Sequence, residues 1–326
     1  MATFTVNNAD DSGAGSLRDA IALANKTPGN DRIRFDSQLK GKEIVLTSGE
    51  LQITDSVKIK GFFDADELKI SGNSNSRIFN VDDSNTQERI NVVFKRLTLT
   101  DGSSDTGGGA IANSEDLQVV DSKIINNENT SLEPTGGGGA IRNSDTGKLK
   151  IDRTLIADNQ SSAFGGGITN FGELVVRYSR ISGNQVTGGG GAGIDNRGSR
   201  ADITGSFITN NTNTVGPAGG FGNGTPETTT TVKNSVIFGN KSLNGAGFFV
   251  NAGRVEITNT VVAKNQAQNN GGGAGIAAAG NLSVKNSLIF GNSAVTDGGG
   301  IFNEGGTLDV ETSAIFSNSP NDIVEI

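Results

Sequence analysis

Residues 287–303 of this 326-residue chain, SLIFGNSAVTDGGGIFN, contain the two signatures that decide the fold. The first signature reads serine or threonine, any residue, an aliphatic residue, any two residues and asparagine. The second is a run of glycines closed by an aliphatic or aromatic residue. Both return along the chain, as in SVIFGN at 235–240, SAIFSN at 313–318 and GGGAI at 107–111. The stretch is therefore one unit of an internal repeat.

The repeat occurs eight times from about residue 107, with fixed spacing inside each copy. Steps of 25 to 30 residues separate the residues that close successive glycine runs, which are Ile111, Ile141, Ile168, Ile194, Phe221, Phe248, Ile276 and Ile301. The asparagines that end the first signature are Asn127, Asn159, Asn184, Asn211, Asn240, Asn265, Asn292 and Asn318. Eight matches indicate a solenoid, in which each coil contacts only its neighbours.

The apolar spacing within each copy predicts short strands. Apolar residues two apart, interrupted by turn residues, are typical of strands with one buried face. Because parallel crossovers are right-handed, we expect an all-β, right-handed parallel β-helix of roughly eleven coils with three strands each. Like residues then stack in columns. We expect an inward hydroxyl ladder, an asparagine ladder at a left-handed corner, and glycines at another corner.

The first 30 residues predict a cover for the open end of the solenoid. In GSLRDAIALANKTPGN at 15–30, Ser16 is the expected N-cap and Asp19 follows it by three residues. Leu17, Ala20 and Ile21 lie on one apolar stripe of the helix. We therefore expect residues 1–30 to form a strand and a capping helix, and residues 31–326 to form a single β-helix domain. The C-terminus shows no corresponding helix.

Composition excludes several functional classes. The chain has no cysteine and no histidine, which removes disulfides, thiolate nucleophiles and Ser-His-Asp chemistry. A net charge of −8 without a basic run is a poor match for nucleic acid. No apolar stretch reaches the length of a membrane helix, about 18 residues, and the first residues, MATFTVNNADD, lack a signal-peptide core. We expect no nucleic-acid partner, no membrane span and no cofactor.

A charged and aromatic cluster is the best candidate for chemistry. Asp121, Arg153 and Tyr178 each follow the last apolar strand position by two residues, in three consecutive coils. Their neighbours include Asp152, Arg177 and Arg180. The cluster predicts a lyase-like or sugar-acid-binding site on the outer face, and the alternative is a ladder of opposite charges that stabilises a solvated surface.

Calcium is the one metal that the sequence suggests. Asp101 and Asp105 alternate with serines in DGSSDTGG at 101–108, as the first ligands of a calcium loop do. The glycine falls one place late, and no glutamate stands at the twelfth position of the loop. The pair remains a candidate calcium site.

Apolar residues occupy outer positions in the C-terminal coils. Strand alternation points the residue after each hydroxyl outward, and from Phe207 onward this residue is apolar. The full set consists of Phe207, Val236, Val261, Leu288, Phe238, Phe290 and Phe316. It predicts a contact face for a homo-oligomer or for a further part of the chain. The alternative is that the backbone turns the last three phenylalanines into the core.

Two stretches resemble known families. GGAI at 108–111 and 138–141, with an aliphatic-x-x-Asn downstream, resembles the GGA(I/L/V) and FxxN repeats of polymorphic outer-membrane autotransporter adhesins, with Ile or Val in place of Phe. TFTVNNADDSGAGSLRDAIALAN at 3–25, followed by IRF and LTSGELQI, looks like the N-terminal region of CSLREA-type secreted bacterial β-helix proteins.

These resemblances imply an exported, surface-associated and often adhesive protein. They lead us to expect a non-enzymatic extracellular or cell-surface β-helix that spaces, adheres or assembles, with a glycan or a host-surface ligand as its partner. The alternative is a polysaccharide-binding or polysaccharide lyase-like β-helix that acts on an acidic glycan.

Overall fold

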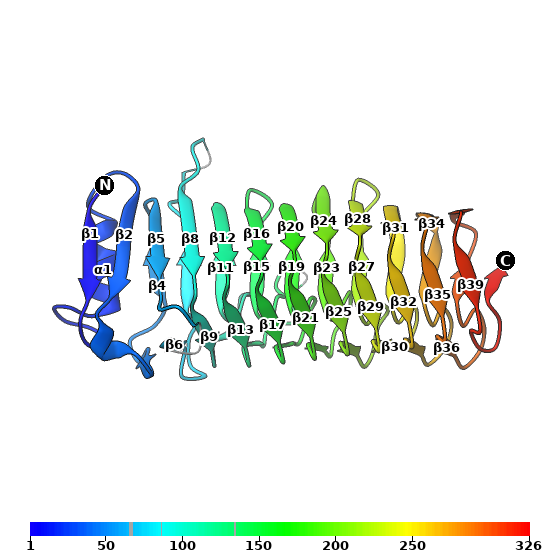
Figure 1. Cartoon of the computed structure of the whole chain (residues 1–326), viewed down its shortest axis with the longest axis horizontal. Coiled ribbons are helices and arrows are strands. Elements are labelled where there is room, and N and C mark those ends of the chain that lie inside the picture. The colour runs from blue at the N-terminus through cyan, green and yellow to red at the C-terminus, as the bar shows by residue number, and fades with distance from the viewer. Residues whose placement is uncertain (65–67, 86, 134) are drawn as a thin grey trace.

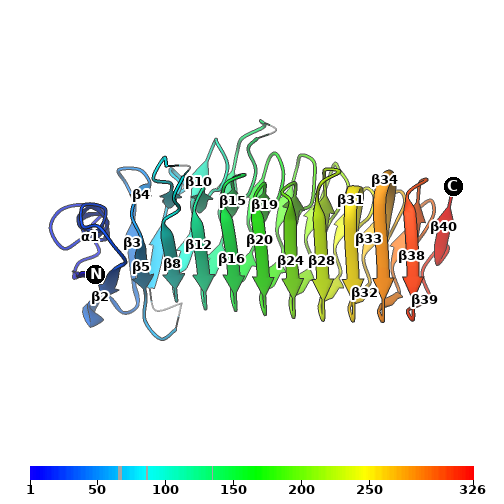
Figure 2. The ribbon, with the colours of Figure 1, turned by 90° about the horizontal axis from the view of Figure 1, so that it is seen from above.

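The chain folds into a parallel β-helix of about eleven turns (Figures 1 and 2). The computed structural model describes residues 1–64, 68–85, 87–133 and 135–326. Strands within this part form three parallel sheets of 21, 11 and 8 strands, here called sheets A, B and C. The predicted all-β parallel β-helix is confirmed.

The strands are short and follow one another around each turn. Sheet A contains β1 (Thr3–Val6), β2 (Asp31–Phe35), β4 (Leu51–Ile53), β5 (Val57–Lys60), β7 (Phe79–Val81), β8 (Asn91–Lys95), β11 (Ile111–Asn113), β12 (Asp116–Val120), β15 (Ile141–Asn143), β16 (Lys148–Asp152), β19 (Ile168–Asn170), β20 (Glu173–Arg177), β23 (Ile194–Asn196), β24 (Arg200–Thr204), β27 (Phe221–Asn223), β28 (Thr229–Lys233), β31 (Phe248–Thr258), β34 (Ala274–Lys285), β37 (Ile301–Asn303), β38 (Thr307–Glu311) and β40 (Ile323–Glu325). Sheet B contains β3 (Lys42–Val45), β6 (Leu68–Ser71), β9 (Thr98–Thr100), β13 (Lys123–Ile125), β17 (Leu155–Ala157), β21 (Arg180–Ser182), β25 (Phe207–Thr209), β29 (Val236–Phe238), β32 (Val261–Ala263), β35 (Leu288–Phe290) and β39 (Ala314–Phe316). Sheet C contains β10 (Ser103–Ser104), β14 (Glu128–Asn129), β18 (Gln160–Ser161), β22 (Gln185–Val186), β26 (Thr212–Asn213), β30 (Lys241–Ser242), β33 (Gln266–Ala267) and β36 (Ser293–Ala294).

Most regular coils have four strands, one more than the sequence predicted. The extra strand arises because sheet A is interrupted within these coils, for example at the bend between β11 and β12. At this bend the Asn113 side chain donates to the carbonyl of Glu115 at 2.9 Å and accepts from its N–H at 3.3 Å. Such a local side-chain turn competes with the strand ladder and interrupts it.

A second asparagine ladder, which the sequence analysis missed, lies at this bend. Asn113 donates to Asn143, Asn143 to Asn170, and Asn170 to Asn196, each at 2.7 Å. Where Val250 and Ile276 occupy the equivalent position, the two strands of the coil merge into the long strands β31 and β34. The two strands are therefore separate where an asparagine occupies the bend, and they are continuous where Val250 or Ile276 replaces it.

The predicted ladder from Asn127 to Asn318 is present at the corner between sheets B and C. Each side-chain amide donates to the next asparagine oxygen at 2.9–3.0 Å. The left-handed backbone, however, belongs to the preceding residue, as in Asn126 and Asn210, both at φ 57°. The preceding residue turns the chain, which leaves the ladder asparagine free to point inward.

The serine and threonine column points inward as predicted, but within the described part of the chain its hydroxyls do not bond to one another. The N–H of Ser179 donates to the hydroxyl of Ser206 in the next coil at 3.1 Å. That hydroxyl donates to the carbonyl of Thr204 at 2.9 Å. The glycine corner is also as predicted, because a Cβ on Gly139 would lie 2.3 Å from the carbonyl oxygen of Gly166.

The two ends of the solenoid differ. Helix α1 (Leu17–Ala24) has Ser16 as its N-cap and packs its buried stripe against β1, β2 and β4. β1 pairs in parallel with β2 and so forms the first strand of the solenoid. At the C-terminal end, Ile315 and Ile323 are only partly covered. None of the helices in the described residues is long and apolar enough to cross a membrane.

Candidate functional site

The candidate residues Asp121, Arg153 and Tyr178 lie in one column at the corner between sheets A and B. Each is the first residue after a five-residue strand of sheet A, and each has a positive φ, between 45° and 50°. We call the whole series the corner column. Its members are Arg96, Asp121, Arg153, Tyr178, Gly205, Asn234, Asn259, Asn286 and Thr312.

The backbone of the corner column favours glycine and asparagine. Left-handed backbone strains side chains that carry a Cβ, and asparagine tolerates it better than bulky residues do. Coils from Gly205 to Asn286 follow this preference. The four earlier coils instead have Arg, Asp, Arg and Tyr. Aspartate also tolerates left-handed backbone, but arginine and tyrosine are bulky residues that it disfavours. Unfavoured residues at strained positions are a reason to consider a function for their side chains.

Asp121 gathers three cations around one carboxylate. Its oxygens lie 2.7 Å from Nε of Arg153, 3.3 Å from Nζ of Lys95 and 4.0 Å from Nε of Arg96. Arg153 also contacts Asp152 at 2.7 Å. Partial burial alone would raise the pKa of Asp121, but the hydrogen bonds from Arg153 and Lys95 lower it. The carboxylate therefore stays ionised, and the local charge remains positive.

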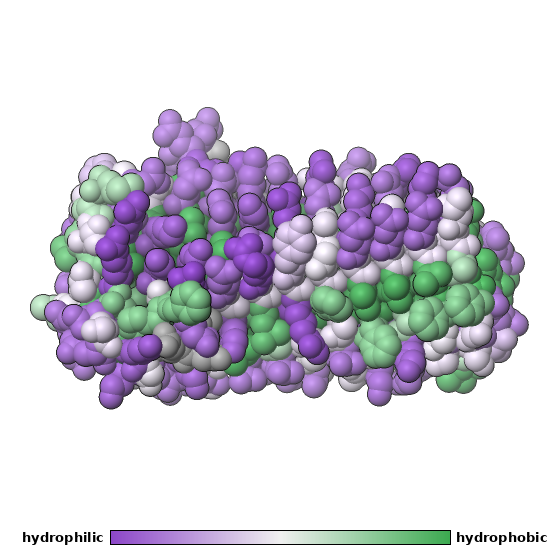
Figure 3. All heavy atoms as spheres, in the orientation of Figure 1, coloured by the Kyte–Doolittle hydropathy of each residue, from purple (hydrophilic) through white to green (hydrophobic). Residues whose placement is uncertain are grey.

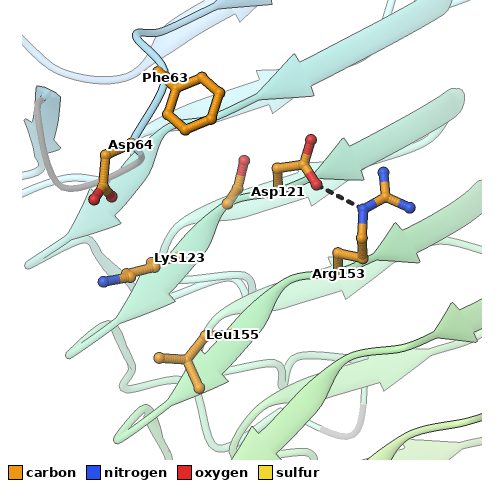
Figure 4. A pocket seen from close by; sticks show the side chains of 7 residues that line it. Phe63, Asp64, Asp121, Lys123, Arg153 and Leu155 are labelled. Carbon is orange, nitrogen blue, oxygen red and sulfur yellow. Dashed lines mark hydrogen bonds and ion pairs between the residues drawn. The ribbon is translucent and has the colours of Figure 1, made fainter.

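An open cavity of about 330 Å³ lies beside this ion pair (Figure 4). Its lining consists of Phe63, Asp64, Asp121, Ser122, Lys123, Arg153 and Leu155. The ring of Phe63 is 85% exposed, and the guanidinium of Arg96 lies 5.0 Å from its centre. The site thus offers cations and one exposed aromatic ring on a concave surface.

Tyr178 belongs to the corner column but does not line the cavity. Its exposed ring covers Gly205, where ring carbons lie 2.8–2.9 Å from the position that a Cβ would take. Among the described residues, no hydrogen bond joins Tyr178 to Arg153. Arg177 and Arg180 are exposed on either side of Tyr178. The structure therefore brings Asp121 and Arg153 together and leaves Tyr178 as a separate surface further along the axis.

Four cations that the sequence analysis passed over lie on the outer face of β2 and β5. Arg32 pairs in register with Lys58, and Arg34 with Lys60. All four are exposed and line a hollow of about 150 Å³. We call them the cationic grid. Its sequence signal is not a basic run but two alternating pairs, RIR and KIK, on strands that become neighbours only after folding.

The candidate calcium ligands lie apart from the carboxylate cluster that the structure contains. Asp101 accepts the hydroxyl of Thr100 at 2.9 Å, and Asp105 lines a different, polar cavity. Among the described residues, Asp82, Asp83 and Glu115 form a group of carboxylates whose oxygens lie within 4.8 Å of one another.

Glu115 holds this group to the body of the solenoid. Its two oxygens accept from the N–H of Asp83 at 3.4 Å and of Ile90 at 3.1 Å. Burial of the carboxyl, reinforced by the nearby charge of Asp83, raises the pKa of Glu115 to about 7. Both oxygens already have protein donors, so the Glu115 carboxyl bridges the backbone N–H groups of Asp83 and Ile90.

The predicted outer apolar set forms a continuous band on sheet B (Figure 3). Its first column pairs Phe207, Val236, Val261, Leu288 and Ala314 in register. Phe238 and Phe316 of the second column are 37% and 44% exposed, and Phe290 stacks on Phe316 with ring centres 5.5 Å apart. The alternative of inward phenylalanines is therefore wrong. We call these residues the apolar strip.

The fold and site together define a parallel β-helix with a cationic, partly aromatic outer corner. The sequence matches no family model and no curated protein. Solved structures that are similar in fold include the following two. The Azotobacter vinelandii mannuronan C-5 epimerase AlgE6 A-module is 14% identical, with a TM-score of 0.35 and 99% of each chain covered. Geobacillus virus E2 ORF18 is 14% identical, with a TM-score of 0.36, covering 95% of this chain and 60% of that chain. These values assign no activity.

Proposed function

We propose that this protein is a non-enzymatic β-helix of the cell surface or extracellular matrix that binds an acidic glycan at the corner column and the adjoining cavity. The carrying observation is the composition of the corner column. Arg96, Asp121, Arg153 and Tyr178 occupy left-handed positions for which the next four coils use glycine or asparagine. Of these, Arg96, Arg153 and Tyr178 are kept there against the preference of the backbone.

The chemistry of these side chains suits a sugar acid. Guanidinium groups bind carboxylates through parallel N–H donors. Arg153 lines the cavity, and Arg96 lies against the ring of Phe63, which also lines it. The exposed rings of Phe63 and Tyr178 are flat apolar surfaces, which suit the carbon faces of sugar rings. A polymer with one carboxylate per residue offers both kinds of contact.

The same geometry favours binding over lyase chemistry. A lyase needs a side chain that takes up a proton from the sugar. The hydrogen bond to Asp121, with its charge and that of Asp152, raises the pKa of Arg153 above the ordinary arginine value. A guanidinium that holds its proton this firmly acts as a cation and not as a base at neutral pH.

Binding of polygalacturonate and polymannuronate, measured by calorimetry beside a neutral glucan, tests this proposal. We expect both acidic polymers to bind and the neutral one not to bind. The double variant Arg153→Gln/Lys95→Gln should weaken binding by about tenfold or more, because it removes two of the three cations around Asp121. Absence of binding to any acidic polymer would overturn the proposal, and an unsaturated product absorbing in the ultraviolet would support the lyase alternative instead.

We also propose that a second copy of this chain covers the apolar strip. The strip is flanked by small neutral residues, such as Asn259 and Gly291, and its cationic neighbours are Lys264, 5.8 Å from the centre of the Phe238 ring, and Arg180, which pairs with Phe207 at one end. A continuous apolar surface suits a partner of the same kind, and a two-fold axis supplies one from the same chain.

A further inference from the structure

We infer that a single acidic glycan chain lies along the solenoid axis, with its carboxylates on a cationic track. It crosses six neighbouring strands of sheet A, which are β2, β5, β8, β12, β16 and β20. The track consists of Arg34, Lys60, Lys95, Arg96, Arg153 and Arg177. The inference rests on the proposed function, and it adds the direction, the length and the class of the ligand.

The first half of the track is set by strand register. Arg34 lies opposite Lys60, and Lys60 lies opposite Lys95. Neighbouring strands are about 4.8 Å apart, so these three cations form a line parallel to the axis. Arg32 and Lys58 of the cationic grid stand beside the line and widen its positive surface.

The second half of the track passes through the proposed glycan site. Asp121 contacts Lys95 and Arg153 and thereby joins the line on β8 to the corner column. Arg177 pairs in register with Asp152 in sheet A, and Tyr178 is the next residue in the sequence. From β2 to β20 there are five strand spacings, about 24 Å. The grid and the cavity are thus two ends of one surface.

The charges of the track are only partly balanced by the protein, because Asp121 pairs with Lys95, Arg96 and Arg153. Among the described residues, no acidic side chain forms an ion pair with Arg34, Lys60 or Arg177. The two acids on the track, Asp121 and Asp152, are both contacted by Arg153. Like charges directly opposite one another destabilise a sheet, and the chain as a whole has a net charge of −8. A bound polyanion would remove this repulsion.

The spacing, and the outward cations of β2 and β5, point to a polyuronate. One unit of an extended 1,4-linked hexuronate chain is about as long as one strand spacing, about 4.8 Å, so successive carboxylates can meet cations of successive coils, except at the coil of β12, which has Val120 and Asp121 there. Proteins that bind single-stranded nucleic acids combine a positively charged groove with aromatic side chains on which successive bases stack. The outward residues of β2 and β5 that form the grid are all cations. An acidic glycan therefore fits the track better than a nucleic acid does.

Oligogalacturonates of three and six units, titrated by calorimetry, distinguish the track from a single site. We expect the wild-type protein to bind the hexamer about tenfold or more tightly than the trimer. Arg34→Gln/Lys60→Gln should remove most of this difference, and Arg153→Gln should weaken both oligomers. Lys233→Gln is the matched control, since Lys233 is an exposed cation in the same strand-end column of sheet A, two coils beyond Arg177, and it should change neither.

The outcomes separate this inference from the proposed function. If Arg153→Gln weakens the hexamer but Arg34→Gln/Lys60→Gln does not, the glycan site stands and the track is overturned. If neither oligomer binds, the proposed function itself fails. Tighter binding of a single-stranded oligonucleotide of similar charge would overturn the ligand class. Unchanged or raised thermal stability of Arg34→Gln/Lys60→Gln, together with lost hexamer affinity, would support a binding role over a structural one.

Discussion

The coils before Gly205 and those after it share one interior and differ at their surface. Inside, the column of Ile156, Ile181, Ile208 and Ile237 continues in register across the boundary. Outside, the earlier coils carry the cationic track, and the later coils carry the apolar strip. The repeat thus constrains the inward positions of every coil and leaves the outward positions free to differ.

The left-handed corner shows this division most clearly. Tyr178 and Asn234 stand two coils apart in the corner column, at φ values of 49° and 51°. The same backbone carries a bulky exposed ring in one coil and a small amide in the other. The fold requires only a turn at this position. The choice of side chain there is therefore available for the function of the surface.

The largest expected effect comes from a ladder residue of the shared interior. The Asn240 side chain accepts from the N–H and amide of Asn211 and donates to Ile208 and Asn265. Asn240→Ala leaves these buried groups unpaired, at about 1–3 kcal/mol each, so we expect a loss of about 3–5 kcal/mol in the free energy of unfolding. Urea denaturation measures it.

Asn318 supplies the comparison within the same ladder. It lies in the last coil, is partly exposed, and ends the ladder on Asp322 at 2.9 Å. Water can replace its hydrogen bonds, so Asn318→Ala should cost about 1 kcal/mol. Equal urea midpoints for the two variants would contradict the view that the interior of the ladder stabilises the C-terminal coils.

How far the fold could be predicted depended on the regularity of the coils. From Ile111 onward, near-constant steps allowed like residues to be aligned, and the ladder that begins at Asn127 followed from that alignment. The bend at Asn113 was missed because its asparagines were not aligned as a column. Their column is also interrupted at Val250 and Ile276, where the strands run on.

An intermediate effect is expected at Tyr178. Tyr178→Asn gives this coil the residue that later coils use, and it relieves a bulky side chain from left-handed backbone, which typically costs of order 1 kcal/mol. We expect the free energy of unfolding to rise by about 0.5–1 kcal/mol while binding of acidic glycan weakens. The reverse change, Asn234→Tyr, should destabilise the protein by a similar amount. A Tyr178→Asn protein that is less stable would mean that the ring packs for structure.

The cationic track could not be found from the sequence by the same route. Arg34, Lys60 and Lys95 are separated by 26 and 35 residues, in coils without the repeat signature. Their register depends on loops of unequal length, whose lengths no periodicity sets. Asp121 and Arg153 were found because they lie in regular coils, where a fixed offset from an aligned strand predicts a shared corner.

The smallest expected effect on stability concerns the apolar strip. Val261 is half-buried and Leu288 exposed on the outer face of sheet B, where a lysine can keep its stem on the surface and its ammonium in water. Val261→Lys/Leu288→Lys should therefore change the free energy of unfolding by less than about 0.5 kcal/mol. If two copies meet at the strip, the same variant places four ammonium groups in one apolar interface, and light scattering should show the mass of one chain where the wild type shows two.

Gln268→Lys adds a lysine to an exposed position of the same coil as Val261 and should leave the mass unchanged. A wild-type protein that stays monomeric at high concentration would leave the apolar strip without the partner proposed for it, and the contrast between the two regions would then rest on the cationic track alone.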